Sequence, residues 1–191
     1  MNDQNLINKL FGVIKESITS MNENMNNSSD QIDGGAATLT DDIENEHEIK
    51  RLCRDFAKTL NDRNYEQLDG RAEYHLYTVD HLIELIKNND EQNTEKLFNE
   101  NKIKSKFEDC EFLKITLSED KEQAEVIYNV RTCIISAEDK YFKSLNKKNN
   151  KKMRISAGTP FRNCYTLAVK KEKGVWKIDE FESSDENMKY D

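Results

Sequence analysis

Hydrophobic positions near the start of the chain recur every three or four residues, which is the spacing of one stripe along a helix. The stripe runs from residue 5 to residue 21 and predicts an amphipathic helix over residues 1–22. Its apolar members are Leu6, Ile7, Leu10, Phe11, Ile14, Ile18 and Met21. Such a stripe must be buried on its own domain, another copy, a partner or a membrane surface. Because only Lys9 and Lys15 are basic here, we expect any membrane contact to be peripheral at most.

The next segment, residues 23–45, is dominated by Asn, Ser, Asp, Gly and Thr. A stretch with so little apolar content does not offset its ordering entropy, so it predicts a flexible linker. Apolar residues at helical spacing return after Glu46 and predict a helix over residues 46–62. Further apolar spacing from Tyr65 to Ile86 predicts one or two more helices, divided near Gly70, and a short helix is expected around residues 94–98.

The hydrophobic period then changes from 3.6 to 2, which indicates strands. Phe112–Leu117 is followed by a turn and by a long alternating run from Gln123 to Thr132. Residues 137–159 form an insertion. Residues 160–170 and 175–183 supply two more strands, of which the last carries the only Trp, Trp176, as an expected core anchor. The pattern predicts an α+β domain over residues 46–184, with N-terminal helices packed on an antiparallel meander sheet, and an acidic tail over residues 185–191.

This order of elements resembles the nuclear transport factor two-like superfamily, in which a curved sheet forms a cone around helices. The residues that carry the resemblance are Ile49–Phe56, Tyr65–Leu68, Gln123–Val130 and Gly174–Ile178. Within that superfamily the chain looks similar to the non-catalytic scaffold domains of conjugation and type IV secretion systems. The resemblance implies an assembly part of a bacterial system. The chain departs from that subgroup because its N-terminal helix is too short and too polar to serve as the usual membrane anchor.

Composition narrows the function classes. With 37 acidic against 29 basic residues the net charge is −8, which argues against binding to nucleic acid. The sequence has no long apolar run and no secretory signal, so a cytoplasmic location is expected. The four cysteines are scattered and do not have zinc-ligand spacing, so they are expected to be free thiols, with Cys133 and Cys164 as a conceivable cross-strand pair. No metal or cofactor is expected.

An enzyme of the cone type needs a buried carboxylate base and an oxyanion donor such as Tyr inside the cone. The residues that qualify as a candidate pocket are Asp55, Tyr74, Tyr77, Asp80 and Tyr128. The alternative interpretation is that the tyrosines are core residues and the polar groups face solvent. His75 and His81 are six residues apart, a spacing that does not favour a shared metal ion on one helix.

Three surfaces are candidate docking sites. The first is the apolar stripe of the N-terminal helix, which is expected to dock on a protein partner or a neighbouring copy through Leu6, Leu10, Phe11, Ile14 and Ile18. The insertion is rich in basic residues, which form an arm for an acidic partner or a solvated loop: Lys140, Lys143, Lys147, Lys148, Lys151, Lys152 and Arg154. The face of the long strand that carries Ile127, Cys133 and Ile135 is a candidate dimer surface. The sequence therefore favours a non-enzymatic interaction or assembly module that binds a protein partner or itself. The alternative is a small-molecule-binding protein or an isomerase or dehydratase that uses the cone interior.

Overall fold

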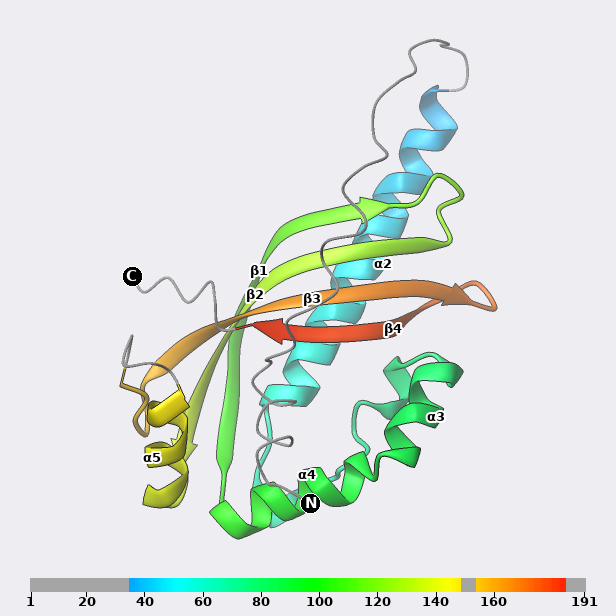
Figure 1. The fold of residues 1–191 in the computed structure, drawn as a ribbon. Coiled ribbons are helices and arrows are strands. Elements are labelled where there is room, and N and C mark those ends of the chain that lie inside the picture. Colours follow the sequence, from blue (N-terminus) through cyan, green and yellow to red (C-terminus); the bar gives the residue numbers. More distant parts are fainter. Residues whose placement is uncertain (1–34, 149–153, 185–191) are drawn as a thin grey trace.

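A computed structural model describes residues 35–148 and 154–184 (Figure 1). Its α-helices are α2 (Gly35–Asn61), α3 (Val79–Lys87), α4 (Asp90–Asn101) and α5 (Asp139–Lys148). Its strands are β1 (Lys104–Leu117), β2 (Gln123–Ser136), β3 (Pro160–Glu172) and β4 (Val175–Ser184), and two short 3₁₀ helices, η1 (Tyr65–Gln67) and η2 (Tyr74–Leu76), link α2 to α3. The predicted amphipathic helix over residues 1–22 and the acidic tail lie outside the described residues.

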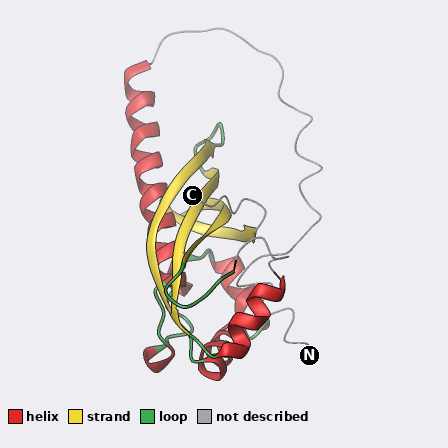
Figure 2. Cartoon of the chain, turned by 90° about the vertical axis from the view of Figure 1, so that its left-hand side faces the viewer, coloured by secondary structure: helices red, strands yellow, loops and turns green. Residues whose placement is uncertain are grey.

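The four strands form one antiparallel sheet in the order β1-β2-β3-β4, a meander in which each strand pairs with the next along the chain. The sheet is curved, and α2 runs along one of its faces (Figures 1 and 2). Along β2 the residues from Ala124 to Thr132 alternate between buried and more exposed, so the buried face is the one that α2 covers. The predicted α+β architecture, helices packed on a meander sheet, is confirmed.

The main core lies between α2 and the buried face of the sheet. Ile49, Cys53 and Phe56 step along α2 by four and three and are fully buried. They meet Tyr128, whose hydroxyl donates a hydrogen bond to the backbone carbonyl of Cys53 at 3.2 Å and whose ring stacks on Phe112 at 5.3 Å between centroids. Tyr128 therefore acts as a core residue that joins the sheet to the helix.

The β3–β4 hairpin closes the sheet as expected. Its two-residue turn, Lys173-Gly174, has positive φ at both positions (54° and 79°), which is the geometry of the tight hairpin turns that match strand twist. Trp176 is buried, and its indole N–H donates to Asn45 Oδ1 on α2 at 3.2 Å. The expectation that Trp176 anchors the core is confirmed.

A second, smaller core lies at the far end of the sheet, under α5. Buried residues from α4, α5 and the ends of β2 and β3 meet there: Leu97, Phe98, Ile103, Ile134, Tyr141, Leu145, Ile155 and Phe161. The insertion that was predicted as a basic loop thus contains a helix. Tyr141 and Leu145, four residues apart, give that helix its buried side. The lysine-rich composition concealed this apolar pair.

A buried ion pair connects α2 to the segment that follows it. The Arg63 guanidinium contacts the Glu73 carboxylate, and the two side chains are only 4% and 3% exposed. Arg63 Nε also donates to the Thr59 carbonyl at 3.1 Å, and the guanidinium lies 5.8 Å from the centre of the Phe98 ring on α4. One side chain therefore holds the end of α2, the η1–η2 segment and α4 together.

Three sequence-based boundaries were wrong. Residues 35–45, predicted as linker, are helical, because Asn45 is held by Trp176 and Asp42 pairs with Lys121 at 2.6 Å. Residues 65–77, predicted as helix, form η1, η2 and turns. This segment lies against α4, where Gly70 packs so closely that an added Cβ would lie 3.0 Å from Glu91 and Glu95. Strand β1 begins at Lys104, well before Phe112. Its first half was not predicted because three register shifts interrupt the alternation of buried and exposed residues.

We expect Arg63→Met to lower the free energy of unfolding by about 3–5 kcal/mol, because it leaves the Glu73 carboxylate buried without its partner. The double variant Arg63→Met/Glu73→Met removes both charges and should recover most of that loss. Urea denaturation measures the change. The exposed pair Lys96–Glu100, 3.9 Å apart, is the control, and Lys96→Met should cost less than about 0.5 kcal/mol. Equal losses at both sites would contradict the role given to Arg63.

Candidate functional site

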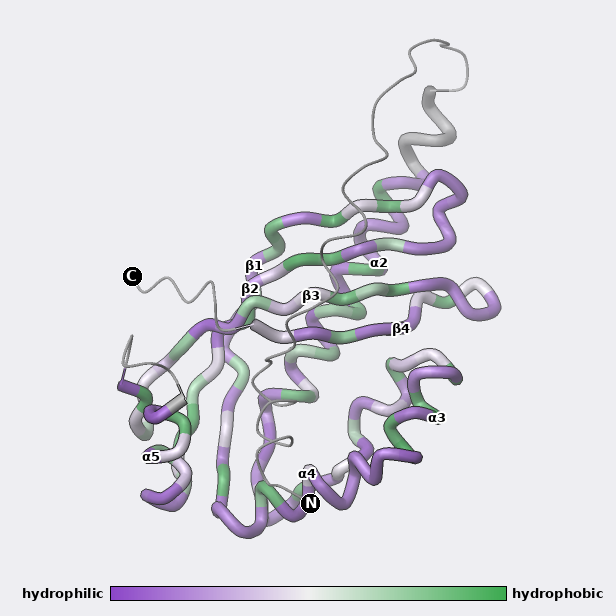
Figure 3. Tube along the Cα trace, in the orientation of Figure 1, coloured by the Kyte–Doolittle hydropathy of each residue, from purple (hydrophilic) through white to green (hydrophobic). Residues whose placement is uncertain are grey.

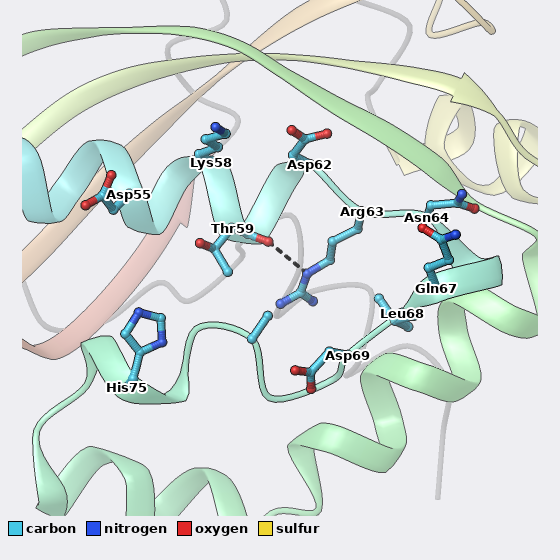
Figure 4. A pocket seen from close by; sticks show the side chains of 11 residues that line it. Asp55, Lys58, Thr59, Asp62, Arg63, Asn64, Gln67, Leu68, Asp69 and His75 are labelled. Carbon is cyan, nitrogen blue, oxygen red and sulfur yellow. Dashed lines mark hydrogen bonds between the residues drawn. The ribbon is translucent and has the colours of Figure 1, made fainter.

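A cleft of about 490 Å³ opens where the C-terminal end of α2 faces the η1–η2 segment (Figure 4). Its lining is mostly polar: Asp55, Lys58, Thr59, Asp62, Arg63, Asn64, Gln67, Leu68, Asp69, Ala72 and His75. Figure 4 shows the Arg63 guanidinium between the end of α2 and the segment that carries Asp69. The cleft exists because Arg63, paired with Glu73, holds this segment at the end of α2.

The cleft has an excess of negative charge. The lining carries three aspartates, Asp55, Asp62 and Asp69, against two cations, Lys58 and Arg63, and the charge of Arg63 is already matched by Glu73. All three aspartates are exposed. The carboxylate base of a cone-type reaction lies in a water-excluding interior, and these exposed carboxylates do not. The lining favours a cationic ligand over an acid–base reaction.

The structure does not bring the five predicted pocket residues together. Asp55 lines the cleft, whereas Tyr128 is buried in the main core. Tyr77 is also buried, with its ring 5.7 Å from that of Phe56 in an edge-on contact. Tyr74 is half-buried beside the core, and Asp80 is exposed in the first turn of α3. The predicted pocket is therefore wrong as a single site.

The buried tyrosines are held in their neutral form. Burial raises the pKa of Tyr128 and of Tyr77 well above the usual value. Burial also raises the pKa of Tyr165 to about 12, although a hydrogen bond with Asn61 acts in the opposite direction. Tyr165 Oη accepts a hydrogen bond from Asn61 Nδ2 at 3.0 Å. These hydroxyls are structural donors and acceptors at neutral pH.

Two buried polar side chains escaped the sequence reasoning. Asn163 Oδ1 and Ser183 Oγ have no hydrogen-bond partner among the described residues, and both side chains lie on the buried face of the sheet. Ser183 pairs in register with Tyr165, and Asn163 lies two residues before Tyr165 on β3. The only sequence signal was a polar residue at a buried register position of a strand.

Three of the seven large hydrophobic side chains that are exposed among the described residues lie on α3. Val79, Ile83 and Ile86 recur at i, i+4 and i+7 on one face and are 60%, 44% and 59% exposed; we call these three residues the α3 ridge. Figure 3 shows hydrophobic positions along α3 beside hydrophilic neighbours. A different side of the helix carries Leu85, which is buried in the main core. A helix that is apolar on two sides normally packs on two neighbours, so the ridge has the character of a docking surface.

The α3 ridge is held firmly by the sheet edge. Thr78 N–H donates to the Ile178 carbonyl at 2.8 Å, and Thr78 Oγ1 caps the helix by accepting from His81 N–H at 3.3 Å. Val79 N–H donates to Glu172 Oε1 at 3.1 Å. These bonds fix the start of α3 on β4 and on the β3–β4 hairpin, so the ridge is rigidly presented.

The docking surfaces that the sequence predicted on the insertion and on β2 are less continuous than the α3 ridge. In the insertion, Lys140, Lys143 and Lys147 on α5 and Arg154 are exposed; Lys151 and Lys152 lie outside the described residues, as does the side chain of Lys148. On the sheet face opposite α2, Ile127 is half-buried, Cys133 is buried and Ile135 is exposed. Strand β2 also presents Glu125 and Arg131 on that face, which breaks the apolar surface.

The four cysteines are free, as predicted: Cys53, Cys133 and Cys164 are buried, and Cys110 is half-buried. Cys133 pairs in register with Pro160, and Cys164 with Asn129, so the conceivable cross-strand pair is not adjacent. Within the described part of the chain, no group of three His, Cys, Asp or Glu side chains is placed to hold a metal ion. None of the described helices is long and apolar enough to cross a membrane.

Comparison with known proteins does not assign a family. No protein-family model and no curated protein matches the chain. The intermembrane space region of the chloroplast protein ARC6 is a structural neighbour with a TM-score of 0.34 and 17% sequence identity, over 62% of this chain and 98% of that one. A likeness at this TM-score is too weak to carry an argument about fold or function.

We expect the free energy of unfolding to fall as the pH rises above about 10. A buried Tyr has a higher pKa in the folded chain than in the unfolded chain, so its stabilisation is complete below the unfolded pKa and is lost as the pH approaches the folded value. For Tyr165 that value is about 12. Urea denaturation at about pH 8 and about pH 11 measures the fall. Comparison with Tyr165→Phe isolates the tyrosine from lysines that titrate in the same range. An identical pH dependence in both proteins would contradict the prediction.

Proposed function

We propose that the chain is a non-enzymatic protein-interaction module whose docking surface is the α3 ridge. The observation that carries the proposal is the exposure of Val79, Ile83 and Ile86 on one face of a helix that is otherwise anchored by Leu85 and the sheet edge. Isolated exposed apolar residues are ordinary, but three in one row on a rigid helix form the surface that amphipathic protein segments recognise.

The packing of the domain interior supports this proposal over an enzyme. Tyr128, Tyr165 and Phe56 fill the space between α2 and the sheet, and each is at most 1% exposed. The rings of Tyr128 and Tyr165 meet edge-on with centroids 5.6 Å apart. A cone-type reaction needs an ionisable group and a hydroxyl that face a substrate, and these hydroxyls instead face Cys53 and Asn61.

The finer assignments rest on the sequence resemblance. Membership of the nuclear transport factor two-like superfamily, a role in bacterial conjugation or secretion, and a cytoplasmic location are carried here as parts of the proposal. They agree with a meander sheet that packs on helices, an architecture that hosts many unrelated activities. The proposal that the α3 ridge is a docking surface does not depend on these assignments, because it is based on the exposure of three apolar side chains.

A ligand-binding function is the second candidate, and the cleft at the end of α2 favours it. Its acidic lining suits a small cation or a basic peptide rather than an anion. Arg63 is the fixed element of that cleft, since its guanidinium is already engaged by Glu73.

A photoreactive side chain tests the α3 ridge directly. The variant Ile83→benzoylphenylalanine is made in the full chain and irradiated inside the cells that express it. We expect it to form a cross-link with one defined protein, which mass spectrometry identifies. Leu113→benzoylphenylalanine is the matched control, because Leu113 is 52% exposed on β1, away from the ridge. The proposal fails if position 83 gives no adduct beyond those seen at position 113.

Variants of the predicted pocket separate the two functions. We expect Asp55→Ala and Asp80→Ala, both at exposed sites, to change the free energy of unfolding by less than about 0.5 kcal/mol and to leave the cross-link at position 83 intact. Tyr128→Phe should cost about 1 kcal/mol through the lost bond to Cys53 and should also leave the cross-link intact. Loss of the cross-link in Asp55→Ala, with the fold intact, would point to the cleft instead.

A further inference from the structure

We infer that the α3 ridge is the docking site for the chain's own amphipathic segment, residues 5–21, and that a partner must compete with this segment. The inference rests on the proposed function of the ridge and names its resting occupant. Two unsatisfied apolar surfaces occur in one chain: the ridge, and the stripe centred on Leu10, Phe11 and Ile14. Each needs a partner of the same kind, an amphipathic helix.

The segment between the stripe and α2 is long enough to reach the α3 ridge. Residues 22–34 separate the stripe from Gly35, where α2 begins. Asn45 lies about 15 Å further along α2, at a rise of about 1.5 Å per residue, and accepts the hydrogen bond from Trp176. Trp176 follows Val175, which pairs with Glu172, and the Glu172 carboxylate binds Val79 N–H at 3.1 Å. Tyr77, two residues before Val79, packs on Phe56 at 5.7 Å between ring centroids, and Phe56 lies about 31 Å along α2 from Gly35, so the ridge begins roughly 30 Å from Gly35.

A chain of this length and composition, treated as a random coil, has a root-mean-square span of about 20 Å, and its maximum reach is about 45 Å. The ridge lies beyond that span but within that reach, so the tether allows the segment to dock and gives an effective concentration below its maximum. The Asn-, Ser- and Gly-rich composition of residues 22–34 suits such a tether.

The small size of the α3 ridge favours a tethered occupant over a free one. Three exposed side chains over about two helical turns cannot alone supply the roughly 1,000 Å² of a stable interface between separate proteins, so a free partner must also contact surface beside the ridge. A tethered segment does not need that area, because its local concentration compensates for weak contacts. A free partner must bind the ridge more strongly than residues 5–21 do at that concentration, so the tether sets a threshold for partner binding.

The charges beside the two surfaces are compatible. Asp80, Glu84 and Lys87 border the ridge on one side of α3, and all three are exposed, so this border has a net charge of −1. The stripe is bordered by Lys15, which follows Ile14 on the predicted helix. Attraction between the net negative border of the ridge and Lys15 favours docking of the segment. Such contacts set the orientation of a bound segment more than its affinity.

Cross-linking from the segment tests the inference. Phe11→benzoylphenylalanine is made in the full chain, and ordinary and ¹⁵N-labelled protein are mixed before irradiation. We expect a cross-link between position 11 and the peptide that contains residues 79–87, with both halves from the same chain. Ile83→Asp/Ile86→Asp should reduce its yield roughly tenfold, whereas Leu113→Asp, at a similarly exposed apolar site, should leave it unchanged.

Three results would overturn the inference: cross-links elsewhere or none, cross-links of mixed isotope, which would make a second copy the occupant, or an equal loss in Leu113→Asp. Hydrogen exchange supplies a second measurement that does not alter the domain. Leu10→Asp/Ile14→Asp should speed amide exchange in α3 if the segment covers the ridge, and unchanged exchange would contradict docking. If these fail while position 83 still captures a separate protein in cells, the ridge keeps its proposed function and only its resting occupant is wrong.

Discussion

The ion pair between Arg63 and Glu73 is the constraint on which the helical half of this domain depends. A guanidinium buried with its carboxylate needs further acceptors, and Arg63 finds one in the Thr59 carbonyl at the end of α2. The backbone of Arg63 also contributes, because its carbonyl accepts a hydrogen bond from Ser105 N–H at 2.8 Å and so fixes the start of β1. The segment that leads to α3 is therefore held on one side by charge and on the other by its bridge from Tyr77 to Ile178 on the edge strand β4.

This arrangement explains why α3 presents an apolar surface to solvent. The helix is attached through its first turn to the β3–β4 hairpin and through Leu85 to the main core, which leaves a third side uncovered by any described residue. The bonds of Thr78 to Ile178 and to Asp179, at 2.8 and 2.9 Å, prevent α3 from rotating to bury that side. Exposure here is thus a product of specific polar contacts at the helix start, which is the behaviour expected of a binding surface rather than of loose packing.

The fold was readable from the sequence where one period ran long enough. The stripe from Ile49 to Leu60 and the alternation from Ala124 to Thr132 gave the helix, the sheet and their contact. The segment from Tyr65 to Leu76 had helical spacing but is bent by tertiary contacts of Arg63, which no local pattern reveals. The site was harder still. Helical spacing shows which residues of α3 are apolar but not which side of the helix faces the core. Tyr128 lies in the core and away from Asp55 because of how the strands pair, which the sequence does not reveal.

The presence of two hydrophobic clusters has a consequence for how the molecule opens. Strands β2 and β3 run through both clusters, but α5, Ile103 and Phe161 contribute only to the smaller one, and α2 and Trp176 only to the larger. Native-state openings commonly follow such divisions, so we expect the end that carries α5, which has the smaller cluster, to open before the rest. Its amides are then expected to exchange through partial opening, and those in the buried part of α2, around Cys53 and Phe56, only when the whole chain unfolds. A protease that cuts near α5 would then leave the sheet edge beside α3 standing, with its docking surface unchanged.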